Sequence, residues 1–171
     1  MKTITFSLSQ KSIKKAIKEI EEYKVYLKQK TIELRQALAQ VGLETAESNV
    51  SGFDGITFEI REDGDTTLLV GWSAKQIRTW WNTREGQVID ENYSPILMAE
   101  FGSGKHAVQG HRGTYPTGKG NGLKDRWSYK PSKDEAPVWT DGETPTRPMM
   151  KASDEMASKV IEVARKVFGN V

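Results

Sequence analysis

Residues 113–120 are the part of the sequence closest to a nucleotide-binding motif. Their sequence, GTYPTGKG, places two glycines and a lysine at the spacing of the phosphate-binding loop GxxxxGK[ST]. That loop needs a buried strand before it, a helix after it, and a Ser or Thr hydroxyl that holds magnesium. Gly120 stands at the hydroxyl position, and the flanking residues are polar and rich in glycine. We therefore predict that this stretch binds neither ATP nor GTP.

Other residue types that carry catalysis or bind metals are few. The chain has no Cys, which excludes disulfides, thiolate zinc sites and Cys nucleophiles. His106 and His111 lie five residues apart, with Asp125 further along and no fourth metal ligand in view. No Ser lies in a GxSxG turn, and no spacing forces two carboxylates together. We therefore expect no enzyme activity, cofactor, metal or small-molecule substrate, although a hydrolase with a site that the sequence does not display stays an alternative.

A basic, aromatic stretch over residues 119–133 is the candidate for nucleic-acid contact. Cationic side chains neutralise phosphates, and aromatic rings stack on bases. The candidate contact residues are Lys124, Arg126, Trp127, Tyr129 and Lys130. The other interpretation is a solvated hairpin whose aromatic rings pack on the domain. It is favoured because residues 134–143 hold four acids and no base, and the whole chain carries a net charge of only +2.

The elements that must position these residues begin with a long helix. The chain has 171 residues and 36% hydrophobic content, typical of one domain. Residues 3–8 alternate as a strand does, and Ser9 is a plausible N-cap. The apolar residues that follow recur every three or four positions and predict a helix over residues 9–41. They are Ile13, Ile17, Ile20, Leu27, Leu34, Leu38 and Val41.

The rest of the chain alternates between hairpin and helix signals. Residues 42–55 are polar and predict a break, residues 56–61 and 67–72 predict a hairpin, and residues 74–89 show no clear period. Ser94 and Pro95 start a short helix that runs to Phe101. Residues 102–143 form a long insertion that is rich in glycine and basic, with a possible second hairpin at 127–129 and 138–140. A final helix starts at Pro148 and ends at Gly169. Within it, pairs of Glu155 with Lys159 and of Glu162 with Lys166 are expected.

These patterns predict a single α+β domain over residues 1–171. We expect an antiparallel sheet packed by the long N-terminal helix and the C-terminal helix, with residues 102–143 as an insertion. No apolar run reaches the ~20 residues that cross a bilayer, so we expect a soluble protein without membrane contact. A helix of about 50 Å is longer than a compact domain of this size, roughly 40 Å across. Part of it should therefore meet another subunit, around Tyr26, Leu27 and Leu34. Trp81 is a further candidate, because alternation exposes one ring of the Trp80–Trp81 pair.

Two segments resemble a known family. Residues 93–104, YSPILMAEFGSG, resemble the Tyr-Ala…Glu-Phe-Gly-Thr signature of minor tail or neck proteins of tailed bacteriophages, the head–tail joining or tail-completion group. Residues 145–152, PTRPMMKA, resemble the Ala-Arg-Pro-Phe-Leu-Arg-Pro-Ala segment that opens the family's last helix. The order of the predicted elements also agrees. Ser103 replaces the usual Thr, Met149 replaces Phe, and the link between the two motifs is longer than the family's.

The resemblance implies a structural role without catalysis. The implied protein is a subunit of a homo-oligomeric ring at the head–tail interface or the top of the tail, in the virion and, during assembly, in the host cytoplasm. Its implied partners are copies of itself, other connector or tail proteins, and DNA that passes through the channel. Phe101 and Arg147, one in each motif, are further interface candidates. An ion pair between Arg147 and Glu100 is one arrangement of the motifs, though not the favoured one. The competing hypothesis is a nucleic-acid-binding module that uses residues 119–133.

Overall fold

The computed structural model describes residues 7, 9–83, 85–107 and 127–169. The fold is α+β, as the sequence predicted. Its β-strands form three separate two-stranded antiparallel sheets, β1–β2, β3–β4 and β5–β6, where one sheet was expected. In chain order the elements are α1 (Gln10–Ser48), β1 (Ile56–Asp63), β2 (Thr66–Ser73), β3 (Gln76–Asn82), β4 (Gln87–Tyr93), α2 (Pro95–Phe101), the 3-10 turn η1 (Gly104–His106), β5 (Trp127–Tyr129), β6 (Val138–Thr140) and α3 (Pro148–Phe168).

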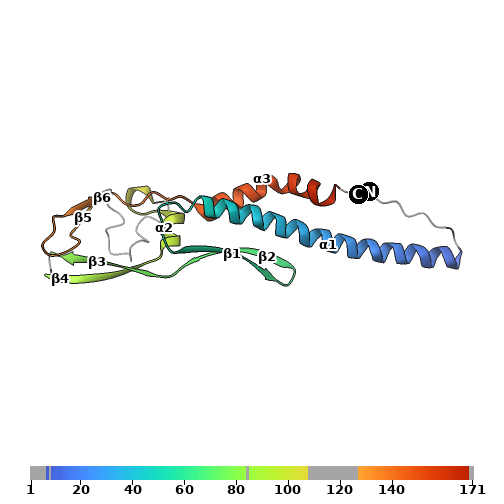
Figure 1. Cartoon of the computed structure of the whole chain (residues 1–171), viewed down its shortest axis with the longest axis horizontal. Helices are drawn as coiled ribbons and strands as arrows, with labels where there is room; N and C mark the ends of the chain where they lie inside the picture. Colours follow the sequence, from blue (N-terminus) through green and yellow to red (C-terminus); the bar gives the residue numbers. More distant parts are fainter. Residues whose placement is uncertain (1–6, 8, 84, 108–126, 170–171) are drawn as a thin grey trace.

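The molecule is elongated, and α1 lies along its long axis (Figure 1). α3 packs along one side of the C-terminal half of α1, and the β1–β2 hairpin packs along another side. The β3–β4 and β5–β6 hairpins lie beyond the C-terminal end of α1, at the opposite end of the molecule from its N-terminus (Figure 1). The predicted contact between the N-terminal and C-terminal helices is therefore confirmed.

α1 is longer than the sequence predicted. Its predicted N-cap is confirmed, because the Ser9 hydroxyl accepts a hydrogen bond from the N–H of Ser12 at 3.3 Å. The predicted break at Gly42 is wrong, because the helix continues to Ser48. Gly42 is buried where Met156 and Leu69 approach, and a Cβ there would lie 2.7 Å from the Met156 sulfur. Tertiary packing here outweighs the low helix propensity of glycine.

The core is small and centres on alanines at the contact between α1 and α3. Ala46 and Ala152 are fully buried and pack together with Phe58 of β1. Side chains this short let the two helices and the hairpin approach closely, where leucines would hold them apart. The partly buried residues around them are Leu43, Val50, Ile56, Leu69, Ile96 and Met149.

The hairpins agree with the sequence analysis where it made a prediction. β1 pairs with β2 from Ile56 opposite Ser73 to Asp63 opposite Thr66, as predicted. The predicted second hairpin is also present as β5–β6. Residues 74–89, which showed no period, form β3 and the start of β4. The N–H of Trp81 donates to the carbonyl of Lys130 at 2.7 Å, so a single bridge joins β3 to the segment after β5.

The two remaining helices begin and end close to the predicted residues. α2 starts at Pro95, and α3 runs from Pro148 to Phe168 with Gly169 after it. The Glu162–Lys166 pair is present at 2.8 Å, whereas Lys159 pairs with Glu162 at 3.1 Å and not with Glu155. Of the strand predicted over residues 3–8, only Ser7 is among the described residues. Residues 113–120 lie wholly outside them. Of the described helices, none is long and apolar enough to span a membrane.

The alanine contact between the helices leads to a stability prediction. Replacing Ala152 by Leu adds three carbons at a fully buried position, and overpacking of this kind costs roughly 1–3 kcal/mol. The free energy of unfolding from urea titration should fall by that amount. Ala157→Leu is the matched control, because Ala157 is exposed on the same helix, and it should leave stability almost unchanged. Equal effects of the two variants would contradict the assigned core.

Glu162 leads to a pH prediction. The hydrogen bond from Lys166, and to a smaller extent that from Lys159, stabilises the ionised carboxylate of Glu162. The pKa of this carboxyl is therefore lowered from 4.5 to about 2. The pKa is lower in the folded state, so this contribution to stability is present above pH 4.5 and is lost as the pH falls toward 2. Glu162→Gln should therefore be less stable than wild type above pH 4.5, and the difference should vanish near pH 2. A difference that does not change with pH would contradict the pairing.

Candidate assembly site

The two motif segments meet at the start of α3. Glu100, near the end of α2, accepts the N–H of Met149 at 2.9 Å through one carboxylate oxygen and that of Met150 at 3.1 Å through the other. The first N–H groups of a helix have no partner within it, and a carboxylate there is favoured by the helix dipole. Glu100 therefore caps α3 although it lies about fifty residues earlier in the sequence. The ion pairs of the described residues do not include the suggested pair of Glu100 with Arg147.

The chain enters α3 through a left-handed residue. Arg147 has φ 56° and ψ 51°, the one positive φ outside glycine among the described residues, and its side chain makes no capping hydrogen bond. The N–H groups of Thr146 and Arg147 donate to the carbonyl of Ala99 at 2.9 and 3.0 Å. These two bonds and the Glu100 cap hold a backbone conformation that non-glycine residues seldom adopt. Phe101 and Arg147, predicted as interface residues, are both half-buried here.

The two ends of the insertion are also joined. Buried Ser103 donates its N–H to the carbonyl of Glu143 at 3.0 Å, and its hydroxyl accepts the N–H of Glu143 at 2.9 Å. Gly102 has φ 67°, and a Cβ on it would lie 2.7 Å from the Glu143 carbonyl oxygen. Gly142 has φ 106°, and its Cβ would lie 2.1 Å from the Ser103 carbonyl oxygen. The backbones approach so closely that both positions require glycine.

A polar group completes this junction. Lys105 forms an ion pair with Asp141, and His106 Nε2 lies 3.6 Å from the other oxygen of that carboxylate. The hydrogen bond from Lys105 lowers the pKa of the Asp141 carboxyl below its usual 3.8. Among the described residues no cluster of His, Asp and Glu could hold a metal ion, and His111 and Asp125 lie outside them. His106 therefore takes part in a structural contact at the base of the insertion.

The N-terminal half of α1 is the second candidate surface. At 1.5 Å per residue, α1 is about 58 Å long and α3 about 31 Å, so α3 can cover only part of α1. We call residues 10–29, which extend past α3, the free half of α1 (Figure 1). Ala16 within it is buried. Ile13, Ile17, Ile20 and Leu27 are exposed on it, with Ile17 at 51%. They continue the line of Leu34 and Leu38, which are half-buried on the part of α1 that packs against α3 and the β1–β2 hairpin.

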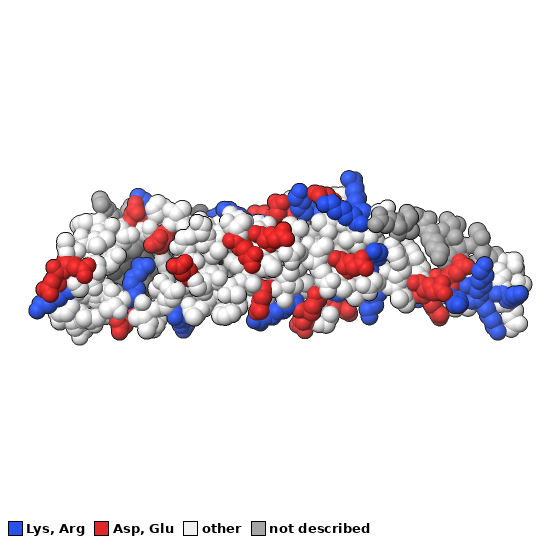
Figure 2. All heavy atoms as spheres, in the orientation of Figure 1, with Lys and Arg blue, Asp and Glu red and all other residues white. Residues whose placement is uncertain are grey.

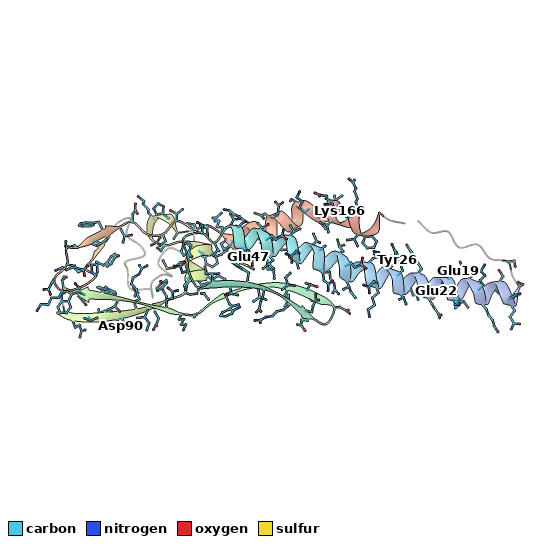
Figure 3. The ribbon with its side chains drawn as sticks, viewed as in Figure 1. Glu19, Glu22, Tyr26, Glu47, Asp90 and Lys166 are labelled. Carbon is cyan, nitrogen blue, oxygen red and sulfur yellow. The ribbon has the colours of Figure 1, made fainter. Side chains whose placement is uncertain are left out.

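Tyr26 lies on the free half of α1 but off this line (Figure 3). Its ring stacks on Tyr23 with centroids 6.0 Å apart, and the Lys30 ammonium lies 6.0 Å from its centroid. The Tyr26 hydroxyl is buried and has no hydrogen-bond partner among the described residues. Of the three residues predicted on this helix, Leu27 is thus exposed, whereas Tyr26 and Leu34 are half-buried.

The candidate nucleic-acid residues are only partly described. Lys124 and Arg126 lie outside the described residues, and only the backbone of Trp127 is described, as the start of β5. Tyr129 and Lys130 are half-buried, and the Lys130 ammonium donates to the Lys133 carbonyl at 2.9 Å. Trp81, which was expected to be exposed, is half-buried beside them. The described part of this stretch holds the β5–β6 hairpin against β3.

Sequence reasoning missed the cap by Glu100. The signal was present, because Arg147 before Pro148 is a poor N-cap residue, and some other group must then satisfy the first N–H groups of the helix. It also missed the outer face of the β1–β2 hairpin, where Leu68 and Trp72 are exposed at alternating positions of β2. The signal was the apolar run of Leu68, Leu69 and Val70, because successive residues of a strand point to opposite faces and both faces therefore carry apolar side chains.

Comparison with known proteins gives no relative: no family model, curated protein or solved structure matches this chain. The resemblance to phage tail and neck proteins therefore rests on the two motifs and the order of the elements. The structure brings the two motifs into direct contact through Glu100 and Ala99.

The cap gives a test of this junction. Glu100→Ala removes both acceptors and should lower the free energy of unfolding by about 0.5–2 kcal/mol, the usual cost of losing a helix cap. Glu100→Gln should cost less, because an amide oxygen still accepts one N–H. The control is Glu21→Ala on the free half of α1, where Glu21 makes no ion pair among the described residues. Urea unfolding measures all three variants, and a Glu100→Ala variant as stable as the control would contradict the cap.

Proposed function

We propose that this chain is a structural subunit of a tailed-phage particle, which joins head and tail or completes the tail by assembling with copies of itself. The observation that carries the proposal is the free half of α1. Its exposed apolar residues continue the line along which α1 packs inside the subunit. A second surface that covers them would gain roughly 25 cal/mol for each Å² of apolar area removed from water.

The junction of the two motifs supports the resemblance behind this proposal. The segment around Glu100 and the segment around Pro148 resemble one family's signatures, and they touch through the cap of α3. Residues that one family shares at separate places in the sequence are expected to meet when they serve a common architecture. Other connector or tail proteins and the DNA of the channel are the further partners that we propose.

The proposal is tested on the purified full-length chain. Light scattering should give a mass that is a multiple of 19.2 kDa, and electron microscopy should show rings. Leu27→Glu should reduce the mass to that of one chain, because it places a charge on the exposed apolar line.

Val25→Glu is the matched control, because Val25 is 70% exposed on the same helix but lies off that line, so its rings should persist. Circular dichroism should show that both variants keep their helices. A wild-type chain that stays monomeric at high concentration would remove the ring. If that monomer also bound DNA with an affinity that falls with salt, the nucleic-acid-binding module would replace the proposal.

A further inference from the structure

The β1–β2 hairpin has an exposed outer face with an apolar strip. Leu68, Val70 and Trp72 alternate along β2, so their side chains share one face of the hairpin. Leu68 is 42% exposed and Trp72 48% exposed. The opposite face carries Phe58 and Leu69, which pack in the core against α1. The outer face therefore lies away from the helix of its own subunit.

The hairpin and the free half of α1 carry opposite charges. Residues 56–73 hold four acids and one arginine, a net charge of −3. Residues 10–29 hold six lysines and three glutamates, a net charge of +3. Figure 2 shows blue side chains at the tip of α1. The two elements thus carry net charges of opposite sign. On the hairpin, Glu59 is paired with Arg61 and Glu62 accepts a hydrogen bond from Gln36 of its own α1, which leaves Asp63 and Asp65 near the turn for the lysines of another copy.

We propose that the free half of α1 docks on the outer face of the β1–β2 hairpin of a second copy of this chain. This inference rests on the proposed function and names the two surfaces that would join its subunits. The lengths agree: Leu68 to Trp72 spans about 13 Å along a strand, and Ile17 to Leu27 spans about 15 Å along a helix. The hairpin of the same subunit cannot serve, because it packs against the C-terminal half of its own α1.

The pattern of α1 disfavours the simplest alternative, a parallel pairing of two free halves. Ile13, Ile20 and Leu27 recur every seven residues, as one core position of a coiled coil does. Lys24 occupies the other core position of the same repeat. A parallel pair would place the two Lys24 ammonium groups against each other in an apolar seam, which is costly. Docking on the hairpin does not bring two Lys24 ammonium groups together. A contact between two different surfaces can also close into a ring, which a twofold helix pair alone does not.

Two variants, each defective in one surface, test the contact. Ile17→Glu changes the helix surface, and Trp72→Glu changes the hairpin surface; both positions are about half exposed, so neither change buries a charge. Each variant alone should have the mass of one chain by light scattering. Mixed in equal amounts, they should form a species of two chains and stop there, because one intact helix and one intact hairpin remain. Two controls should assemble as wild type does: Val25→Glu, exposed on the free half of α1 but off its apolar line, and Val88→Glu, exposed on β4.

The outcomes separate this contact from the proposed function. If Trp72→Glu assembles as wild type does, or if the mixture of variants stays monomeric, the helix–hairpin contact is wrong while self-assembly of the wild type stands. If the wild-type chain itself is monomeric, both the contact and the proposed function are wrong. Raising the salt from 0.15 M toward 1 M shortens the Debye length from about 8 to about 3 Å, so assembly by this contact should weaken. Circular dichroism of every variant checks that the fold is kept.

Discussion

The close packing of α3 against α1 at Ala46, Ala152 and Gly42 is the contact on which the rest of the structure depends. It is the largest contact between elements outside the hairpins, and it fixes where α3 lies along α1. The start of α3 is in turn bound to the end of α2 by Glu100 and Ala99. α2 and the base of the insertion are therefore positioned through the same helix pair.

The lengths of the two helices then determine the shape. α3 ends after 21 residues while α1 has 39, and the β1–β2 hairpin covers the same half of α1 as α3 does. A core made largely of alanines is narrow, and of the described residues in the remaining half of α1 it includes Ala16 alone. The exposed apolar residues of the free half are a direct consequence of this mismatch.

The sequence predicted the elements whose signals are local. The spacing from Ile13 to Val41, the alternation in residues 56–72 and the Pro148 start of the last helix each identified an element correctly. It failed where distant contacts decide: Gly42 stays helical because Met156 packs on it, and Glu100 caps a helix about fifty residues away. The β3–β4 hairpin was missed because its apolar residues lack a regular period. At the candidate site, Leu27 is exposed, while its predicted place in an interface stays a prediction, and the role of Glu100 was missed.

The base of the insertion and the free half of α1 lie apart along the long axis. The base of the insertion, with Ser103, Asp141 and Gly142, lies toward the end that carries β5–β6, and the free half of α1 forms the other end (Figure 1). The two hydrogen bonds between Ser103 and Glu143 hold the first and last residues of the insertion together, whatever the length of chain between them. A longer link than the resembled family has is thus accommodated without changing the contact between α1 and α3.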